Sequence, residues 1–239
     1  MSEWFADFAA KFSTAFLVGD RWKLYTKGLV TTLELTVVAL VLGVVLGVVV
    51  AVVRAAHDQQ RLGRRNWALG FLNAICQVYT TVIRGTPMMV QLLIWGFVIF
   101  KTSRNRFMVG VLGLGINSGA YVAEIVRGGL MSVDAGQSEA GRSLGLGYLD
   151  TMRFIVVPQA FKNSLPSLGN EFITLFKDTS LVSAIGGMEL VYYAQAVGGK
   201  TFDVMYPYIG IAVMYLVFVM IFTWLQGKLE RRLRQSDRR

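Results

Sequence analysis

The run LVTTLELTVVALVLGVVLGVVVAVV, from Leu29 to Val53, decides the fold of this chain. As a helix it would extend about 37 Å, enough to cross a hydrocarbon core about 30 Å thick. The chain is 54% hydrophobic and 16% charged, with a mean hydropathy of +0.51, whereas a soluble domain is usually about a quarter charged. The sequence therefore predicts an integral membrane protein and disfavours the alternative, a buried core helix of a soluble protein.

Four further apolar segments support this interpretation. Trp67 to Phe100 is interrupted by the string Arg84-Gly85-Thr86-Pro87, and Phe107 to Leu130 is lightly polar. Leu181 to Ala196 and Tyr206 to Leu225 complete the set. We predict an all-α integral membrane protein with five transmembrane helices at these positions.

Positive charge indicates the orientation, because Lys and Arg accumulate in cytosolic loops. With the N-terminus outside, the inner segments are Arg54 to Asn66, Arg127 to Lys162 and the tail after Gln226. They hold 14 of the 24 Lys and Arg residues, against 8 in the outer segments. We predict an N-terminus outside and a cytosolic C-terminus. This distribution accounts for the net charge of +9 without a nucleic-acid partner, and the tail is suited to contact anionic membrane lipid.

The N-terminus lacks the pattern of a cleavable signal, since acidic Glu3 and Asp7 stand where a basic region is expected. Aromatic residues recur every three to four positions from Trp4 to Phe16, which predicts an amphipathic helix. Such a helix suits either the outer membrane interface or packing on the rest of the protein. We divide the chain into this extracytoplasmic segment (1–27), a transmembrane domain (28–227) and a basic cytosolic tail (228–239).

Residues suited to enzymatic chemistry are scarce. The single cysteine, Cys76, excludes an internal disulfide, and the single histidine, His57, excludes a multi-histidine zinc site. Gly198-Gly199-Lys200-Thr201 is similar to part of a phosphate-binding loop, but Ala194 stands where that loop needs a glycine. We expect no catalytic residue, no metal site and no cofactor bound by this chain.

A polar loop from Val133 to Pro158 interrupts the apolar sequence on the predicted cytosolic side. Asp134 can cap a short helix over Ala135 to Leu144, and Gln137 can reach back to complete a capping box. The helix carries mostly small residues, which permit close approach by a partner. We interpret the loop, about 132–162, as a docking site for a cytosolic protein.

The second half of this loop contains a turn and a second helix. Gly145 and Gly147 allow the turn, and the helix is expected from about Asp150 toward Pro158. Its apolar residues are expected to be buried: Met152, Phe154, Ile155, Val156 and Val157. Glu139 and Arg142 offer charges to a partner, although both also fit the alternative of local helix-end charges.

Glu139-Ala140-Gly141, followed by Gly145 and by Ile155-Val156-Val157-Pro158, resembles a known motif. Its form is Glu-Ala-Ala, three residues, Gly, nine residues, Ile-x-Leu-Pro, and it marks the permease subunits of ABC importers. Gly141 replaces alanine and Val157 replaces leucine. Both are small apolar exchanges, and we expect Gly141 to loosen the short helix.

The flanking sequence is similar to the polar amino-acid branch of that family, the histidine, glutamine and arginine type. The similarity extends from about Gly28 to Leu225. The strings that carry it are Arg84-Gly85-Thr86-Pro87 with Gln91, Ala120 to Gly129, Gly136-Gln137, Pro158-Gln159-Ala160 and Lys177-Asp178-Thr179-Ser180-Leu181.

The resemblance implies a type I importer permease in a bacterial plasma membrane. Two permease subunits, identical or homologous, would form the pathway, and a pair of cytosolic ATPase subunits would use ATP and Mg²⁺. An extracytoplasmic binding protein would deliver a polar amino acid. The residues that would contact the ATPase are Glu139, Ala140, Gly141, Arg142, Gly145 and Pro158.

Ionisable and polar residues within membrane segments are candidates for the substrate pathway. We predict six of them: Glu34, Arg84, Thr86, Asn117, Tyr121 and Glu171. For Arg84, the alternative is a side chain that extends to the lipid headgroups. The small-residue pairs Gly43/Gly47 and Gly115/Gly119 are expected to be helix packing seams.

Two other functional classes stay open from the sequence. One is a secondary transporter or channel that works without ATP, and the other is a membrane assembly subunit without a transport role. Neither accounts for the whole set of matching strings. The sequence does not identify the amino acid, because a binding protein normally sets that choice.

Overall fold

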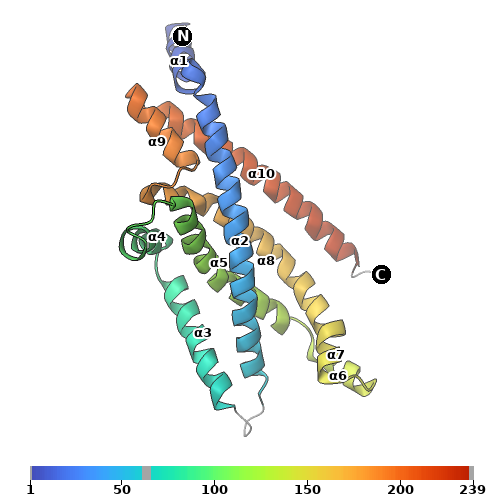
Figure 1. Cartoon of the computed structure of the whole chain (residues 1–239). Coiled ribbons are helices and arrows are strands. Elements are labelled where there is room, and N and C mark those ends of the chain that lie inside the picture. Colours follow the sequence, from blue (N-terminus) through green and yellow to red (C-terminus); the bar gives the residue numbers. More distant parts are fainter. Residues whose placement is uncertain (1, 61–65, 237–239) are drawn as a thin grey trace. The chain divides into compact units, whose positions relative to one another are not determined.

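The computed structural model describes residues 2–60 and 66–236, all of them in helices joined by turns (Figure 1). The α-helices are α1 (Ser2–Phe16), α2 (Trp22–Asp58), α3 (Trp67–Gly85), α4 (Met88–Ile94), α5 (Arg106–Met131), α6 (Ala135–Ser143), α7 (Tyr148–Thr151), α8 (Val157–Asp178), α9 (Leu190–Thr201) and α10 (Met205–Ser236). Short 3-10 helices η1 (Val18–Asp20) and η4 (Thr179–Ile185) and π-helices η2 (Trp95–Ile99) and η3 (Met152–Val156) link them.

The helices divide into two compact units, each assembled from three stretches of chain. Unit 1 comprises Met1–Ala39, Met88–Leu114 and Ile173–Trp224. Unit 2 comprises Leu40–Pro87, Gly115–Phe172 and Leu225–Arg239. The chain therefore passes repeatedly between the units, and helices α2, α5, α8 and α10 each contribute residues to both.

Within the residues that the structure describes, three helical stretches are long and apolar enough to cross a membrane: Val18–Asp58, Arg106–Met131 and Met205–Leu233. They contain the predicted segments that begin at Leu29, Phe107 and Tyr206. An 18-residue window of the first has a mean hydropathy of 3.1, so its length and composition alone were sufficient to predict it.

The predicted interruption of the second segment is a sharp break in the chain. Helix α3 ends at Gly85 and α4 begins at Met88, and the bent pair of α3 with α4–η2 is long and apolar enough for one crossing. Thr86 is extended, with φ −118° and ψ 145°, because the ring of Pro87 disfavours helical backbone in the residue before it.

The predicted helix from Leu181 to Ala196 is wrong as a continuous element. The structure has the 3-10 helix η4 up to Ile185, then Gly186 with φ +83°, and then a separate helix α9. Gly186 adopts a left-handed conformation that residues with a Cβ rarely enter. Glu189 then begins α9 as its N-cap, accepting hydrogen bonds from the N–H groups of Val191 and Tyr192, both at 2.9 Å.

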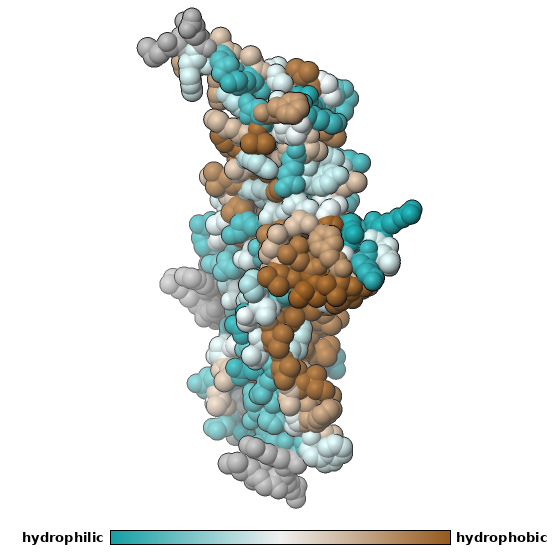
Figure 2. Space-filling view, turned by 90° about the vertical axis from the view of Figure 1, so that its left-hand side faces the viewer, coloured by the Kyte–Doolittle hydropathy of each residue, from teal (hydrophilic) through white to brown (hydrophobic). Residues whose placement is uncertain are grey.

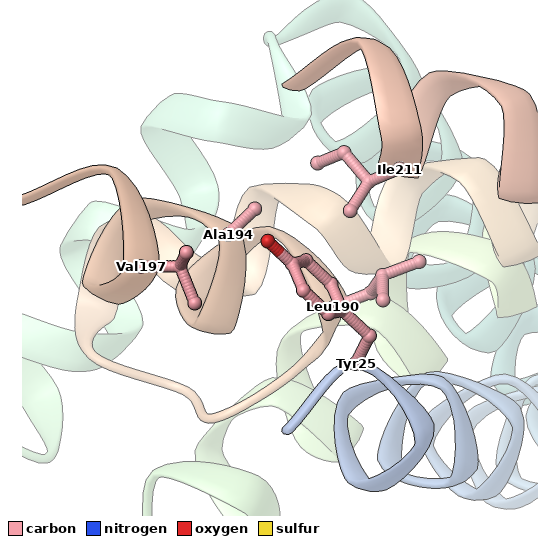
Figure 3. Close-up of a cluster of buried hydrophobic side chains, with 5 residues drawn as sticks. All are labelled: Tyr25, Leu190, Ala194, Val197 and Ile211. Carbon is pink, nitrogen blue, oxygen red and sulfur yellow. The ribbon is translucent and has the colours of Figure 1, made fainter. Parts of the chain in front are cut away.

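The core of unit 1 forms where α9 packs against α2 and α10. Figure 3 shows Tyr25, Leu190, Ala194, Val197 and Ile211 converging from these helices. The α2 backbone approaches closely at Gly28, where a Cβ would lie 2.8 Å from Leu190 Cα. Glu189, fully buried beside this cluster, also accepts a hydrogen bond from Tyr215 Oη at 3.2 Å.

The aromatic stripe of the N-terminal segment lies on α1, as predicted. Phe8 contacts Tyr206 of α10 at 5.6 Å between ring centroids, and Phe16 contacts Tyr25 of α2 at 4.8 Å. Trp4 and Phe5 remain largely exposed. The helix thus packs on unit 1 through part of its stripe and leaves the rest available to a membrane interface.

Unit 2 is held together by the small-residue seams that the sequence indicated. A Cβ at Gly43 would lie 2.9 Å from Ser118, and one at Gly47 would lie 2.6 Å from Val122. Gly115 lies equally close to Leu42. These positions bring α2 and α5 together and confirm that the seams serve helix packing.

Large apolar surfaces remain uncovered on each unit. In unit 1, the hydrophobic (brown) area in the middle of Figure 2 lies over α4 and η2, where Phe97, Val98 and Ile99 are all more than half exposed. In unit 2, Phe71, Ile75, Val78 and Val82 form an exposed stripe at helical spacing along α3. Such surfaces fit lipid or a partner subunit.

The structure leaves two sets of predictions untested. The basic residues at 61, 64 and 65 and the tail residues Arg238 and Arg239 lie outside the described residues. The proposed boundaries at 27/28 and 227/228 stay predictions, although both positions fall inside helices, α2 and α10.

Candidate functional site

The polar loop of unit 2 contains the short helix α6, which is separated from the end of α5 by three residues. Asp134 caps it as predicted, its side chain accepting a hydrogen bond from Gly136 N at 2.7 Å. The reciprocal half of the capping box is not seen. Gln137 Oε1 instead accepts a hydrogen bond from Gln159 Nε2 of α8 at 3.2 Å, which ties the start of α6 to α8.

The loop turns back at Gly145, whose φ of +83° requires a residue without a Cβ. Gly147 has an ordinary backbone and precedes α7. The second helix does not end near Pro158 as expected. It continues through the π-helix η3 into α8, and Pro158 is the second residue of α8. The N–H of Val157 donates a hydrogen bond to Met152 O, five residues earlier, as in a π-helix. This wider helical turn lies immediately before Pro158, which has no N–H to donate.

Gly141 is the one buried glycine in α6. A Cβ there would lie 3.0 Å from Ile155 Cδ1 and from Thr151 Cγ2. The missing methyl group therefore permits close packing of α6 on η3, and the expected loosening of the helix is offset by that contact. The other residues predicted to dock a partner, Glu139, Ala140, Arg142, Gly145 and Pro158, are exposed.

Several apolar side chains around α6 face solvent. Leu144 is 82% exposed and Leu149 is 77% exposed. Phe154 and Val157, which were expected to be buried, are 63% and 46% exposed. The helical phase of η3 explains the difference, because Val156 and Ile155 point inward and leave their neighbours outside. The loop thus presents apolar and charged groups together.

Hydrogen bonds join the loop to the surrounding helices of unit 2. Tyr148 of α7 donates to Gln59, just beyond the end of α2. Asn163 Nδ2 of α8 donates to Ser132 Oγ, just beyond the end of α5, at 2.9 Å. The loop is therefore positioned by the ends of three long helices.

Two predicted pathway residues meet in unit 2. The Arg84 guanidinium lies over the Tyr121 ring, 5.4 Å from its centroid. Arg84 Nη1 also lies 3.8 Å from Glu124 Oε1. This combination holds a cation of α3 against α5 through both a ring face and a carboxylate.

The other pathway candidates occupy separate positions. In unit 2, Glu171 Oε1 accepts a hydrogen bond from Ser118 Oγ at 2.7 Å, Asn117 is buried, and Thr86 Oγ1 donates to Val82 O at 2.8 Å. In unit 1, Glu34 is exposed on α2 beside a cavity of about 330 Å³ that Lys27 and Arg104 also line. Within unit 2, the partners of Glu171 and Thr86 are thus other residues than Arg84 and Tyr121.

The sequence did not indicate a site role for two charged residues of α2, Arg54 and Asp58, which pair with Glu124 and Arg127 of α5. Arg54 Nη1 donates to Glu124 Oε1, and Asp58 Oδ2 lies 3.3 Å from Arg127 Nη1. These pairs are about 70 positions apart, so no sequence spacing indicated them. Gly198 to Thr201, dismissed as a phosphate loop, lies in helix α9, which confirms that dismissal.

The long apolar helices and the exposed polar loop define a multi-spanning helical membrane protein, and the comparisons identify its family. Residues 43–235 match the family described as "Binding-protein-dependent transport system inner membrane component". The chain therefore belongs to this family. It is an inner membrane permease component of an ABC transporter, and not a catalytic subunit.

Named relatives agree with this assignment. The chain is 34% identical to the L-cystine transport system permease protein TcyB of Bacillus subtilis, over 89% of this chain and 87% of that protein. It is 38% identical to the arginine transport system permease protein ArtQ of the same organism, over 68% and 76%. The glutamine transport system permease protein GlnP of Escherichia coli gives the same values.

Solved structures share the fold. A crystal structure of an amino acid ABC transporter with histidines superimposes with a TM-score of 0.78 and 40% identity, over 88% of this chain and 94% of that one. An inward-facing structure of the MetNI methionine ABC transporter gives a TM-score of 0.73 at 17% identity, which supports the fold alone.

Proposed function

We propose that this chain is the permease subunit of an ATP-driven importer of polar amino acids. The observation that carries the proposal is the exposed segment from α6 to the start of α8. It presents charged and apolar side chains, and α6 is held in place by its packing on η3. Relatives named for glutamine, arginine and cystine transport support the substrate class. The choice among these amino acids belongs to a separate binding protein.

The chain crosses the membrane five times, with its N-terminus outside and its C-terminus in the cytosol. Helix α8 takes the place of the predicted Leu181–Ala196 crossing. Its 22 residues extend about 33 Å, enough for one crossing. Its polar side chains are partnered within unit 2, as Glu171 with Ser118, which lowers the cost of placing them in the membrane.

Helix α6 enters a groove of a cytosolic ATPase. The contact with the ATPase is formed by Glu139, Ala140, Arg142, Gly145 and Pro158. Gly141 allows the close packing of α6 on η3. Leu144, Leu149 and Phe154 add apolar area that a partner would cover, since such groups in water favour association. The ATPase uses ATP and Mg²⁺, and this chain binds neither.

Two permease subunits, identical or homologous, enclose the pathway, and an extracytoplasmic binding protein delivers the amino acid. Glu34 lies in the first crossing beside a cavity with Lys27 and Arg104, a position suited to a zwitterion. Arg84, Thr86, Asn117, Tyr121 and Glu171 contribute further along the pathway. Nucleotide-driven closure of the ATPase pair moves α6 and switches access between the two sides.

The test reverses one charge on α6. Glu139→Lys should leave the permease folded but prevent the ATPase from co-purifying, and labelled amino-acid uptake into liposomes should fall with it. Asp7→Lys, a reversal at another exposed acidic residue outside this loop, is the matched control and should behave as wild type. Retained ATPase with full uptake in Glu139→Lys contradicts the docking role, and uptake without ATP contradicts the importer assignment.

A further inference from the structure

One carboxylate in unit 2 is shared by three arginines from three helices. Glu124 of α5 accepts from Arg54 of α2 and lies 3.8 Å from Arg84 Nη1 of α3, both at Oε1. Its other oxygen, Oε2, lies 3.5 Å from Arg127 Nε. The Glu124 and Arg54 side chains are only 24% and 14% exposed. Both carboxylate oxygens are therefore committed to cations.

The charge balance makes this carboxylate indispensable to the cluster. Glu124 separates three guanidinium groups that would otherwise repel one another in a region of low dielectric. Asp58 offsets part of the excess by pairing with Arg127 at 3.3 Å. Glu124 thus links both α2 and α3 to α5, beside the Asp58–Arg127 pair and the contact of Arg84 with the Tyr121 ring.

The C-terminal end of α5, close to this cluster, is closely connected to the polar loop that contains α6. After Met131 only three residues separate α5 from α6. Gly129 packs so closely on Ala160 and Ser164 of α8 that no Cβ fits there, and Ser132 accepts a hydrogen bond from Asn163. A displacement of α6 therefore moves the inner part of α5 with it.

The far side of the cluster ends at a break in the chain. Arg84 stands in the last turn of α3, immediately before Gly85 and the extended Thr86. A pull on Arg84 is applied next to the point where the helix is broken. Breaks of this kind absorb backbone rotation more readily than a continuous helix does.

We infer that Glu124 is a positioning residue through which movement of the short helix α6 reaches helices α2 and α3. The inference rests on the proposed function, because it assumes that an ATPase moves α6. Glu124 touches neither ATPase nor substrate in this role. It acts by keeping three helices joined while α5 is displaced.

The experiment compares uptake with ATP hydrolysis in proteoliposomes that contain the permease, its ATPase and a loaded binding protein. Glu124→Gln should still assemble with the ATPase, and the number of amino acids imported per ATP should fall about tenfold, a coupling loss within the usual range. Glu230→Gln, which alters a carboxylate that accepts from Gln226, is the control and should keep the wild-type ratio.

Two further variants separate transmission from folding. Glu124→Asp keeps the carboxylate charge and should retain much more of the ratio than Glu124→Gln. Arg54→Gln, which leaves two cations on the carboxylate, carries the test if Glu124→Gln does not assemble, and its ratio should fall severalfold. A wild-type ratio in Glu124→Gln or Arg54→Gln, or an assembled Glu124→Asp variant as poor as Glu124→Gln, overturns the inference. Absence of ATP-driven uptake by the wild-type complex would instead refute the proposed function.

Discussion

Gly47 and Gly70 differ in what surrounds them, although both are glycines in helices. A Cβ at Gly47 would lie 2.6 Å from Val122, whereas one at Gly70 would meet nothing within 4 Å. Replacing glycine by alanine in a helix gains about 1 kcal/mol of helix propensity, but overpacking costs about 1–3 kcal/mol. Gly70→Ala should therefore stabilise the protein, and Gly47→Ala should destabilise it.

Thermal unfolding in detergent, followed by circular dichroism, measures both variants against wild type. Equal midpoints for the two variants would show that the α2–α5 seam tolerates a methyl group, and would contradict the packing role of Gly47.

At the scale of elements, α9 depends on a buried carboxylate cap. Glu189 is fully buried and receives two backbone N–H groups and the Tyr215 hydroxyl. Glu189→Ala leaves those donors without an acceptor and should cost about 1–3 kcal/mol of unfolding free energy. Glu189→Gln keeps one acceptor oxygen and should cost less. Denaturant unfolding in detergent ranks the variants. A wild-type midpoint for Glu189→Ala would show that the cap does not stabilise the protein.

The elements also show what local sequence can and cannot predict. The Leu29–Val53 crossing, the Asp134 cap and the break before Pro87 follow from composition or from immediate neighbours, and all three were predicted. The interruption between η4 and α9 was not, because the apolar character of the segment favoured one helix over two local signals: Gly186, which has a positive φ, and Glu189, which caps α9. Arg54 was counted only as a cytosolic charge, since its partner Glu124 is 70 positions away.

For the whole molecule, the uncovered apolar surfaces and the proposed pathway imply assembly with further subunits. Expressed with its ATPase and purified in mild detergent, the permease should elute as a complex with two permease copies and two ATPase copies. Native mass spectrometry measures this stoichiometry. A complex with a single permease copy would contradict the shared pathway, and a requirement for a second, different permease would show that the pair is not identical.

The three-residue connection between α5 and α6 also restricts how this molecule can change over time. Three residues reach only about 10 Å even when fully extended, so the start of α6 must stay close to the end of α5. Insertions that surface loops normally tolerate would let α6 shift while α5 stays in place, and ATP would be consumed without import. Length variation among functional descendants of this chain should therefore be confined to other connections, and this joint should keep its size even where its residues change.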